Sequence, residues 1–303
     1  MKISILMAVG ENASRMGEAL AGIRAQTHPD WELLVVEYGA ASEARGLVQA
    51  FGALTGRPVT HLHLGENHGP ASARNRLLEL ATGEWVAFLE PCDQWTPSHL
   101  TNAALQLVAA VDIVVSDVLI ENPPLPLSAL APSPQLDVNA ARTLFVRDAL
   151  PVISALALRR ALAVEAGFFD TQFRVGEARD LWLRCALRGA HFGRTRHATC
   201  RTVRVNDPDP REAFLSVDQR IRFYEKHRDL AVIPAALRRH LLSASLVAKG
   251  RLLRGSDPLA AARCFGRAWT LQPMHIQTLG QLALIGSRSN TPVSPAKKPS
   301  SSI

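Results

Sequence analysis

E-W-V-A-F-L-E-P-C-D-Q-W-T-P, residues 84–97, is the stretch that decides the fold of this chain. Its apolar residues 85–89 predict a buried strand, and residues 90–93 follow as a short acidic loop. A helix is expected to begin at Pro97, because the first N–H of a helix is unpaired and proline has none to lose. Acidic groups after a parallel strand lie at the edge where open α/β sheets bind ligands. Such a loop is suited to hold a divalent cation against a diphosphate.

The sequence around this stretch alternates strand and helix patterns through residue 118. Apolar runs predict the strands, and apolar residues at helical spacing predict the helices between them. Because the strands are apolar on both faces, we expect a parallel sheet covered by helices on both sides. The expected strands are 3–9, 31–37, 59–64, 85–89 and 113–118, and the expected helices are 13–26, one from the N-cap Ser42 through Leu54, 70–81 and 97–108.

The rest of the chain changes character twice. Five prolines within 121–134 predict a loop over one edge of the sheet. From residue 211 the pattern is helical only, and the polar, proline- and serine-rich residues 287–303 are typical of disorder. We therefore expect a sheet domain at 1–210, a helical extension at 211–286 and a disordered tail at 287–303. The further elements expected are strands at 152–158 and 199–205, and helices at 181–187, 211–227, 234–254, 258–271 and from His275.

The composition is that of an ordinary soluble globular protein. The 303 residues are 47% hydrophobic and 20% charged, and no apolar run approaches the roughly 18 residues of a membrane span. Four cysteines without a C-x-x-C pair argue against a zinc site or a disulfide framework. The N-terminus has no signal-peptide cleavage pattern, so a cytoplasmic protein is expected.

The net charge of +7 favours anionic partners. Nucleotides and anionic lipid head groups fit this charge, whereas nucleic acid is not expected because no nucleic-acid-binding motif is present. Arginines flank an apolar stripe within 234–254, which leaves open a peripheral contact at the inner face of a membrane. The oligomeric state is left open. The stripe consists of Leu237, Leu241, Leu242 and Leu246.

Four segments, in this order, resemble the family 2 glycosyltransferases with the GT-A fold. The first is A-Q-T-H-P-D-W-E-L-L-V-V-E at 25–37, and the second is G-E-N-H-G-P-A-S-A-R-N-R-L-L-E-L-A-T-G-E-W-V-A-F-L-E at 65–90. The third is E-P-C-D at 90–93, and the fourth is G-E-A-R-D-L-W-L-R at 176–184. The resemblance implies an α/β GT-A fold, Rossmann-like with a mostly parallel sheet and flanking helices, plus a C-terminal α-helical extension.

The resemblance also implies an activity. Such enzymes move a sugar from a nucleoside diphosphate to an acceptor hydroxyl, which requires a counter-charge for the departing diphosphate and a base for the acceptor's proton. For this chain, the resemblance implies that the donor is a UDP-linked nucleotide-sugar. It implies that the acceptor is a glycan or a lipid-linked molecule. It further implies inversion at the sugar, a role in cell-surface polysaccharide biosynthesis, and Mg²⁺ or Mn²⁺ as the cofactor.

The resemblance assigns roles to the matching positions. Glu177 is the expected base, and Asp180, one helical turn further on, is the alternative. Asp93 and Glu90 are the expected metal ligands. The nucleotide is expected to contact Ala8, Glu37, Arg74 and Asn75.

Three positions depart from the family pattern. Tyr38, Cys92 and Ala178 stand where the family usually has acidic residues. A thiol is a soft ligand, whereas Mg²⁺ and Mn²⁺ prefer oxygen. A catalytically degenerate relative that binds a nucleotide or a protein partner therefore stays open as a second function. A nucleotidyltransferase is not favoured, because no glycine-rich, lysine-containing phosphate loop lies near the N-terminus.

Structural roles stay open for the same residues. The acidic residues of 90–93 are also typical of helix N-caps, and those of 177–180 are typical of a solvated helix face paired with Arg179 or Arg184. Arg74 has two acidic neighbours in sequence, Glu79 and Glu84, as alternatives to a phosphate. His61 is expected on the exposed face of its strand.

Overall fold

The computed structural model of the chain describes residues 1–10, 13–40, 43–107, 111–122, 125–132, 136, 139–147, 152–203 and 210–273. The chain divides into two compact units, Met1–Asp209 and Pro210–Ile303. The tail predicted at 287–303, the helix predicted from His275 and the N-cap predicted at Ser42 lie outside the described residues.

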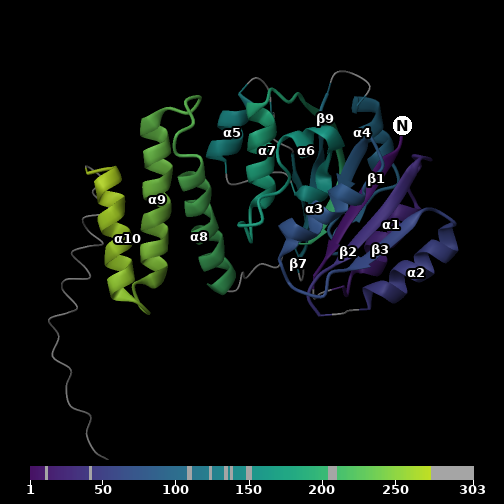
Figure 1. Ribbon diagram of the computed structural model, residues 1–303, viewed down its shortest axis with the longest axis horizontal. Helices are drawn as coiled ribbons and strands as arrows, with labels where there is room; N and C mark the ends of the chain where they lie inside the picture. The colour runs from purple at the N-terminus through teal and green to yellow at the C-terminus, as the bar shows by residue number, and fades with distance from the viewer. Residues whose placement is uncertain are drawn as a thin grey trace, which may run out of the picture. The chain divides into compact units, whose positions relative to one another are not determined.

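Four parallel strands form the first half of the sheet in the order β3-β2-β1-β4. Ile3 lies opposite Trp31 in β2 and opposite Trp85 in β4, so the three strands begin level with one another. The predicted strands and helices of this region are confirmed, with ends shifted by a few residues. The elements are β1 (Ile3–Val9), α1 (Met16–Arg24), β2 (Trp31–Glu37), α2 (Ala44–Thr55), β3 (Val59–His63), α3 (Pro70–Leu80) and β4 (Trp85–Phe88), drawn in purple to blue in Figure 1.

Every residue of β1, β2 and β4 is buried, so both faces of these three strands are covered, since alternate residues point to opposite sides. Residues such as Ile5 and Leu33 pack with buried residues of α1 and α2 in one core. On the opposite face, Phe88 meets the rings of Phe169 and Trp182 edge-on, with centroids 5.5 and 6.3 Å away. The apolar runs seen in the sequence therefore correspond to a sheet covered on both sides.

The second half of the sheet is mixed rather than parallel. β8 (Leu156–Arg159) runs antiparallel to both β4 and β6 (Ile113–Asn122). β9 (Phe192–Val203) runs parallel to β6, and β5 (Gln94–Trp95) runs antiparallel to β9. The parallel pairing expected for the strands up to residue 118 thus holds for β1, β2, β3 and β4, whereas β6 is parallel to β9 and antiparallel to β8. Its flanking helices are α4 (His99–Leu107), α5 (Ala140–Val146), α6 (Arg160–Glu165) and α7 (Glu177–Leu187), with a 3₁₀ turn at Ile153–Ala155.

The proline-rich loop predicted at 121–134 was wrong over most of its length. β6 continues to Asn122, and β7 (Leu125–Ala131) pairs antiparallel with it, Val118 lying opposite Ala131. β7 pairs with β6 alone among the described strands, so Pro126 can lie in it without breaking a second ladder. Pro123 and Pro124 lie outside the described residues.

The helix start predicted at Pro97 was also wrong, by two residues. α4 begins at His99, whose N–H donates to Thr96 O at 3.1 Å. The Pro97 carbonyl instead accepts the N–H of Thr27 at 2.9 Å, which fixes this segment against the end of α1. Pro97 therefore lies two residues before the helix, and its carbonyl bonds the segment between α1 and β2.

The unit from Pro210 consists of helices close to the predicted ranges. They are α8 (Pro210–Lys226), α9 (Ala235–Leu253) and α10 (Pro258–Leu271), drawn in green to yellow in Figure 1. Asp257 caps α10 by accepting the N–H of Ala260 at 2.9 Å. Gly250 lets α9 approach α10 closely, since a Cβ there would lie 2.6 Å from the Phe265 ring.

The apolar stripe of α9 faces the interior of this helical unit. Leu242 and Leu246 are buried, and the Ser243 hydroxyl between them donates to Ala268 O of α10 at 3.1 Å. These two of the four leucines of the stripe therefore take part in helix packing, whereas Leu237 and Leu241 are half-buried. Among the described residues, no helix combines the length and the apolar character needed to cross a bilayer.

Candidate active site

The carboxyl ends of β1, β2 and β4 meet at one edge of the sheet. In the β1–β2 ladder, Val9 lies opposite Glu37, so Ala8 and Glu37 reach the same edge. Glu90 follows two residues after the end of β4. Ligands of open α/β sheets bind at this edge. The strand directions therefore bring three of the predicted site residues into one region.

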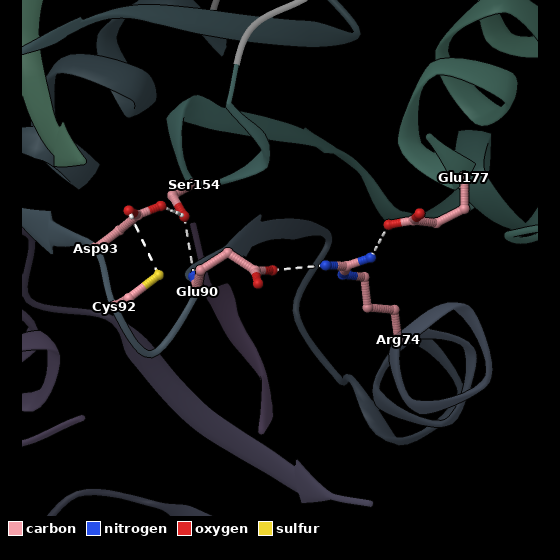
Figure 2. A network of polar contacts seen from close by, with 6 residues as sticks. All are labelled: Arg74, Glu90, Cys92, Asp93, Ser154 and Glu177. Carbon is pink, nitrogen blue, oxygen red and sulfur yellow. Dashed lines mark hydrogen bonds and ion pairs between the residues drawn. The ribbon is translucent and has the colours of Figure 1, made fainter. Parts of the chain in front are cut away.

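Arg74 links two carboxylates that are distant in sequence (Figure 2). It lies buried on α3, where its Nη2 donates to Glu90 Oε1 at 2.6 Å and its Nη1 donates to Glu177 Oε1. Burial alone would lower the pKa of Arg74, but the charges of Glu90 and Glu177 outweigh it and raise that pKa. The guanidinium is thus a permanent cation shared by the acidic loop and the first residue of α7.

The neighbours proposed for Arg74 from sequence have other partners. Glu79 accepts from Arg76 at 2.8 Å, and Glu84 accepts from Arg159 at 2.5 Å. Both of these pairs are at the surface, where ion pairs contribute little. The alternative that tied Arg74 to Glu79 or Glu84 is therefore wrong.

Asp93 is turned into the protein. Its side chain is 1% exposed, and Ser154 Oγ donates to its Oδ2 at 2.5 Å. The same Ser154 hydroxyl accepts the N–H of Glu90 at 2.9 Å, so it ties both ends of the loop together (Figure 2). Burial raises the pKa of Asp93, and the hydrogen bonds from Ser154 and Thr202 oppose that rise.

The loop offers a poor set of ligands for Mg²⁺ or Mn²⁺. No group of three His, Cys, Asp or Glu side chains suited to a metal is found in the part of the chain that the structure describes. Glu90 is bonded to Arg74, and Asp93 is bonded to Ser154. Desolvation, followed by the charges of Asp93 and Glu90, raises the pKa of the Cys92 thiol to about 11, so the thiol is neutral at pH 7. Both ions bind charged or carbonyl oxygen, and the loop as it stands does not fit them.

Asp180 and Asn75 hold the segment that leads into α7. Asp180 is fully buried and accepts from Arg184 at 2.8 Å, while Arg184 also donates to the Phe168 carbonyl at 2.6 Å. The amide of Asn75 bonds both the N–H and the carbonyl of Phe169, at 2.8 and 2.9 Å. These contacts fix the position of Glu177 relative to Arg74.

His61 and Ser154 belong to this edge but were not recognised from the sequence. His61 was expected on an exposed strand face, yet its Nε2 lies 3.3 Å from Glu37 Oε2, and Glu37 is 2% exposed. The register of β3 against β2, with Val35 opposite His61, brings the pair together. Ser154 is separated from Asp93 by 61 residues, and no local pattern marks such a contact.

Known proteins resemble this chain in sequence and in fold. Residues 4–145 match the model for Glycosyl transferase family 2. The putative colanic acid biosynthesis glycosyl transferase WcaA of Escherichia coli (strain K12) is 23% identical over 75% of this chain and 81% of its own length. Other bacterial relatives match over shorter stretches that span 27%, 29% and 35% of their lengths.

Two solved structures show the same fold at low sequence identity. S. aureus TarS 1–349 in complex with UDP-GlcNAc has a TM-score of 0.60 and 15% identity, covering 94% of this chain and 79% of TarS. The mannosyltransferase PcManGT from Pyrobaculum calidifontis, in complex with GDP-Man and Mn²⁺, has a TM-score of 0.60 and 18% identity, covering 95% and 86%. The predicted GT-A class with C-terminal helices is confirmed.

Proposed function

We propose that this chain, a family 2 glycosyltransferase with the GT-A fold, transfers a sugar from a nucleoside diphosphate to a hydroxyl of a glycan or lipid-linked acceptor in bacterial cell-surface polysaccharide biosynthesis. The donor we propose is UDP-linked, and the reaction inverts the sugar. WcaA supports the pathway class, and the UDP-GlcNAc complex of TarS supports the donor class. The observation that carries the proposal is the Arg74 bridge between Glu90 and Glu177 at the ligand-binding edge of the sheet.

Glu177 is the base in this proposal. The acceptor oxygen forms a bond to the anomeric carbon, the bond from that carbon to the diphosphate breaks, and the acceptor proton passes to the Glu177 carboxylate. Arg74 orients that carboxylate through one charge-assisted hydrogen bond from Nη1, while its Nη2 holds Glu90. Asp180 is the weaker candidate, because it is buried against Arg184 and has no exposed surface.

The nucleotide in this proposal lies across the ends of β1 and β2. Ala8 contributes backbone and a small side chain there, and Glu37, supported by His61, contacts the uracil or the ribose. Asn75 braces this pocket indirectly, since its amide is bonded to Phe169. Mg²⁺ or Mn²⁺ stays a prediction from the resemblance and from PcManGT, and no step here depends on it.

The two domains proposed from the sequence differ in net charge. Residues 1–209 contain 19 Lys and Arg against 22 Asp and Glu, a net of −3, whereas residues 210–303 contain 15 against 5, a net of +10. This asymmetry supports a cytoplasmic protein in which the helical extension contacts anionic lipid at the inner face of the membrane. Sedimentation with vesicles of phosphatidylglycerol and of phosphatidylcholine tests this contact, and equal binding to both would rule it out.

A second function is supported by one observation. The poor ligand set of the 90–93 loop favours a degenerate relative that binds a nucleotide or a partner protein without catalysis. The two functions differ in turnover. Calorimetric titration with UDP, GDP and TDP, followed by donor hydrolysis and transfer assays, separates them. Binding with turnover supports the transferase, binding without turnover supports the degenerate relative, and no binding of any nucleotide contradicts both nucleotide-based functions.

A further inference from the structure

The leaving diphosphate of the proposed reaction needs a positive partner, and the 90–93 loop does not supply one through a metal. Asp93 is committed to Ser154, and Glu90 is committed to Arg74. Arg74 itself is buried between two carboxylates, so its charge is already matched. Because Arg74 is held by two carboxylates, a partly exposed arginine at the same edge, with a single carboxylate partner among the described residues, is better placed to meet the diphosphate.

Arg15 lies at this edge. It is the residue before α1, in the connection that leaves the carboxyl end of β1. Its Nη2 donates to Glu18 Oε2 at 2.8 Å, and its side chain is 33% exposed. A guanidinium at the carboxyl end of a central strand lies where the sheet binds its ligands, and an exposed one can meet a ligand without unfolding its surroundings.

A second contact fixes Arg15 beside the loop. Gln94, the residue after Asp93, donates from Nε2 to the same Glu18 Oε2 at 2.6 Å. Glu18 thus joins Arg15 to Gln94, the residue that follows the loop. Because Gln94 continues to satisfy Glu18, Arg15 can turn towards a phosphate without leaving that carboxylate unbonded.

We infer that Arg15 binds the diphosphate of the donor and takes the place of the divalent cation, so that nucleotide binding by this protein is independent of metal. The inference rests on the proposed function and deepens it. Guanidinium groups bind phosphate oxygens through paired, charge-assisted hydrogen bonds, and this chemistry requires only that the guanidinium reach the ligand.

The chain provides a matched control for this role. Arg76 and Glu79 form an i,i+3 pair at 2.8 Å on α3, with the same spacing and distance as Arg15 and Glu18. Both arginines are partly exposed, so substituting either one has a small effect on stability. If only the Arg15 substitution weakens nucleotide binding, the effect comes from the position of Arg15 at the site, because both substitutions remove a surface ion pair.

The experiment is calorimetric titration of the full chain with UDP, in EDTA and in Mn²⁺, for the wild type, Arg15→Gln, Arg15→Lys and Arg76→Gln. We expect the wild type to bind UDP with dissociation constants within about twofold of each other in the two buffers. Arg15→Gln should weaken binding by about 10-fold or more in EDTA, consistent with loss of a charge-assisted bond. Arg15→Lys should retain part of the affinity, and Arg76→Gln should bind as the wild type does.

Three results would overturn the inference. UDP binding that appears only with Mn²⁺ contradicts it and leaves the proposed function intact. Equal binding by Arg15→Gln and Arg76→Gln shows that Arg15 does not meet the diphosphate. Absence of binding to UDP, GDP and TDP in both buffers removes the proposed function together with the inference. Cys92→Asp is an independent check, because restoring an oxygen ligand should make binding stronger in Mn²⁺ than in EDTA.

Discussion

The two ends of β2 both carry a buried glutamate, and the two differ in their surroundings. Glu32, near the amino end, is 8% exposed and accepts from Ser4 Oγ at 2.6 Å, from the Thr82 N–H and hydroxyl at 2.8 Å, and from Lys2 Nζ at 2.9 Å. Glu37, at the carboxyl end, lies 3.3 Å from His61 Nε2. Burial of a carboxylate is therefore common to both edges of the sheet.

The edge of the sheet, rather than burial, separates the two roles. At the amino edge the donors come from β1 and from the segment before β4, so they link strands and stabilise the sheet. At the carboxyl edge, Arg74 joins Glu90 to Glu177, and Glu37 lies at the end of β2. Parallel strands bind ligands at that end, so we propose a stabilising role for Glu32 and a role in the ligand site for Glu37 and Glu177.

The largest expected effect is at the carboxyl edge, on turnover. Glu177→Gln removes the base but keeps an oxygen that can accept from Arg74, so the fold should persist. We expect turnover to fall by about 10²- to 10⁴-fold, the range for a lost general base. The measurement is sugar transfer from a UDP-sugar donor at saturating donor. Glu79→Gln, which removes an exposed partner of Arg76, is the control and should transfer at the wild-type rate. Unchanged turnover in Glu177→Gln would shift the base to another residue.

The next effect is at the amino edge, on stability. Glu32→Gln replaces a carboxylate that accepts several hydrogen bonds by an amide. The NH₂ group of that amide cannot accept a hydrogen bond, so some of the donors lose their partner. We expect the free energy of unfolding to fall by about 2–3 kcal/mol, the cost of disrupting charge-assisted hydrogen bonds in a buried site. Urea unfolding measures it, and UDP titration of the folded variant should give the wild-type affinity. A variant that keeps its stability and loses UDP binding would contradict the division between the two edges.

Glu37→Gln, at the other end of β2, should affect UDP binding more than stability, the opposite of Glu32→Gln. Glu37→Gln is expected to weaken UDP binding by about 10-fold, or about 1.4 kcal/mol, through loss of a charged contact to the nucleoside. Its free energy of unfolding should change by less than that of Glu32→Gln, because Glu32 accepts short hydrogen bonds from several donors, whereas the contact of Glu37 with His61 is longer, at 3.3 Å. Calorimetric titration and urea unfolding of the two variants side by side test this. Equal losses of stability would show that Glu37 is structural.

The sequence predicted the elements of the first half of the sheet well, for a physical reason. β1 and β2 are apolar runs bounded by polar or turn residues, so local patterns determine their ends. The β6–β7 pairing was not predicted, because proline content favours a loop unless the strand is at an edge. β5 is two residues long and is defined only by its pairing with β9.

The site was predicted as a set of positions but not as a set of contacts. Arg74 was compared with the acidic residues nearest in sequence, whereas its partners are 16 and 103 residues away. Glu90 and Asp93 were expected to act together on a metal. In the structure, Glu90 bonds to Arg74 and Asp93 bonds to Ser154. Such choices depend on tertiary packing, which no spacing rule contains.

The smallest expected effect is on how the free energy of unfolding depends on pH, because His99 and Glu32 should lose their contributions in different pH ranges. Burial lowers the pKa of His99 to about 3, against an ordinary value of 6.5, so the stability it contributes is present above pH 6.5 and is lost as the pH falls towards 3. Burial alone would raise the pKa of Glu32, but the bonds from Ser4, Thr82 and Lys2 lower it to about 2, so its contribution is lost only below about pH 4.5. Between pH 6 and 5 we expect the free energy of unfolding to fall by about 1 kcal/mol through His99. Urea unfolding at both pH values should show this fall in the wild type and in Glu32→Gln, and should show it reduced in His99→Gln. An equal fall in the free energy of unfolding in all three proteins would show that a group other than His99 titrates between pH 6 and 5. The role of Glu32 at the amino edge is tested separately, by urea unfolding below pH 4.5.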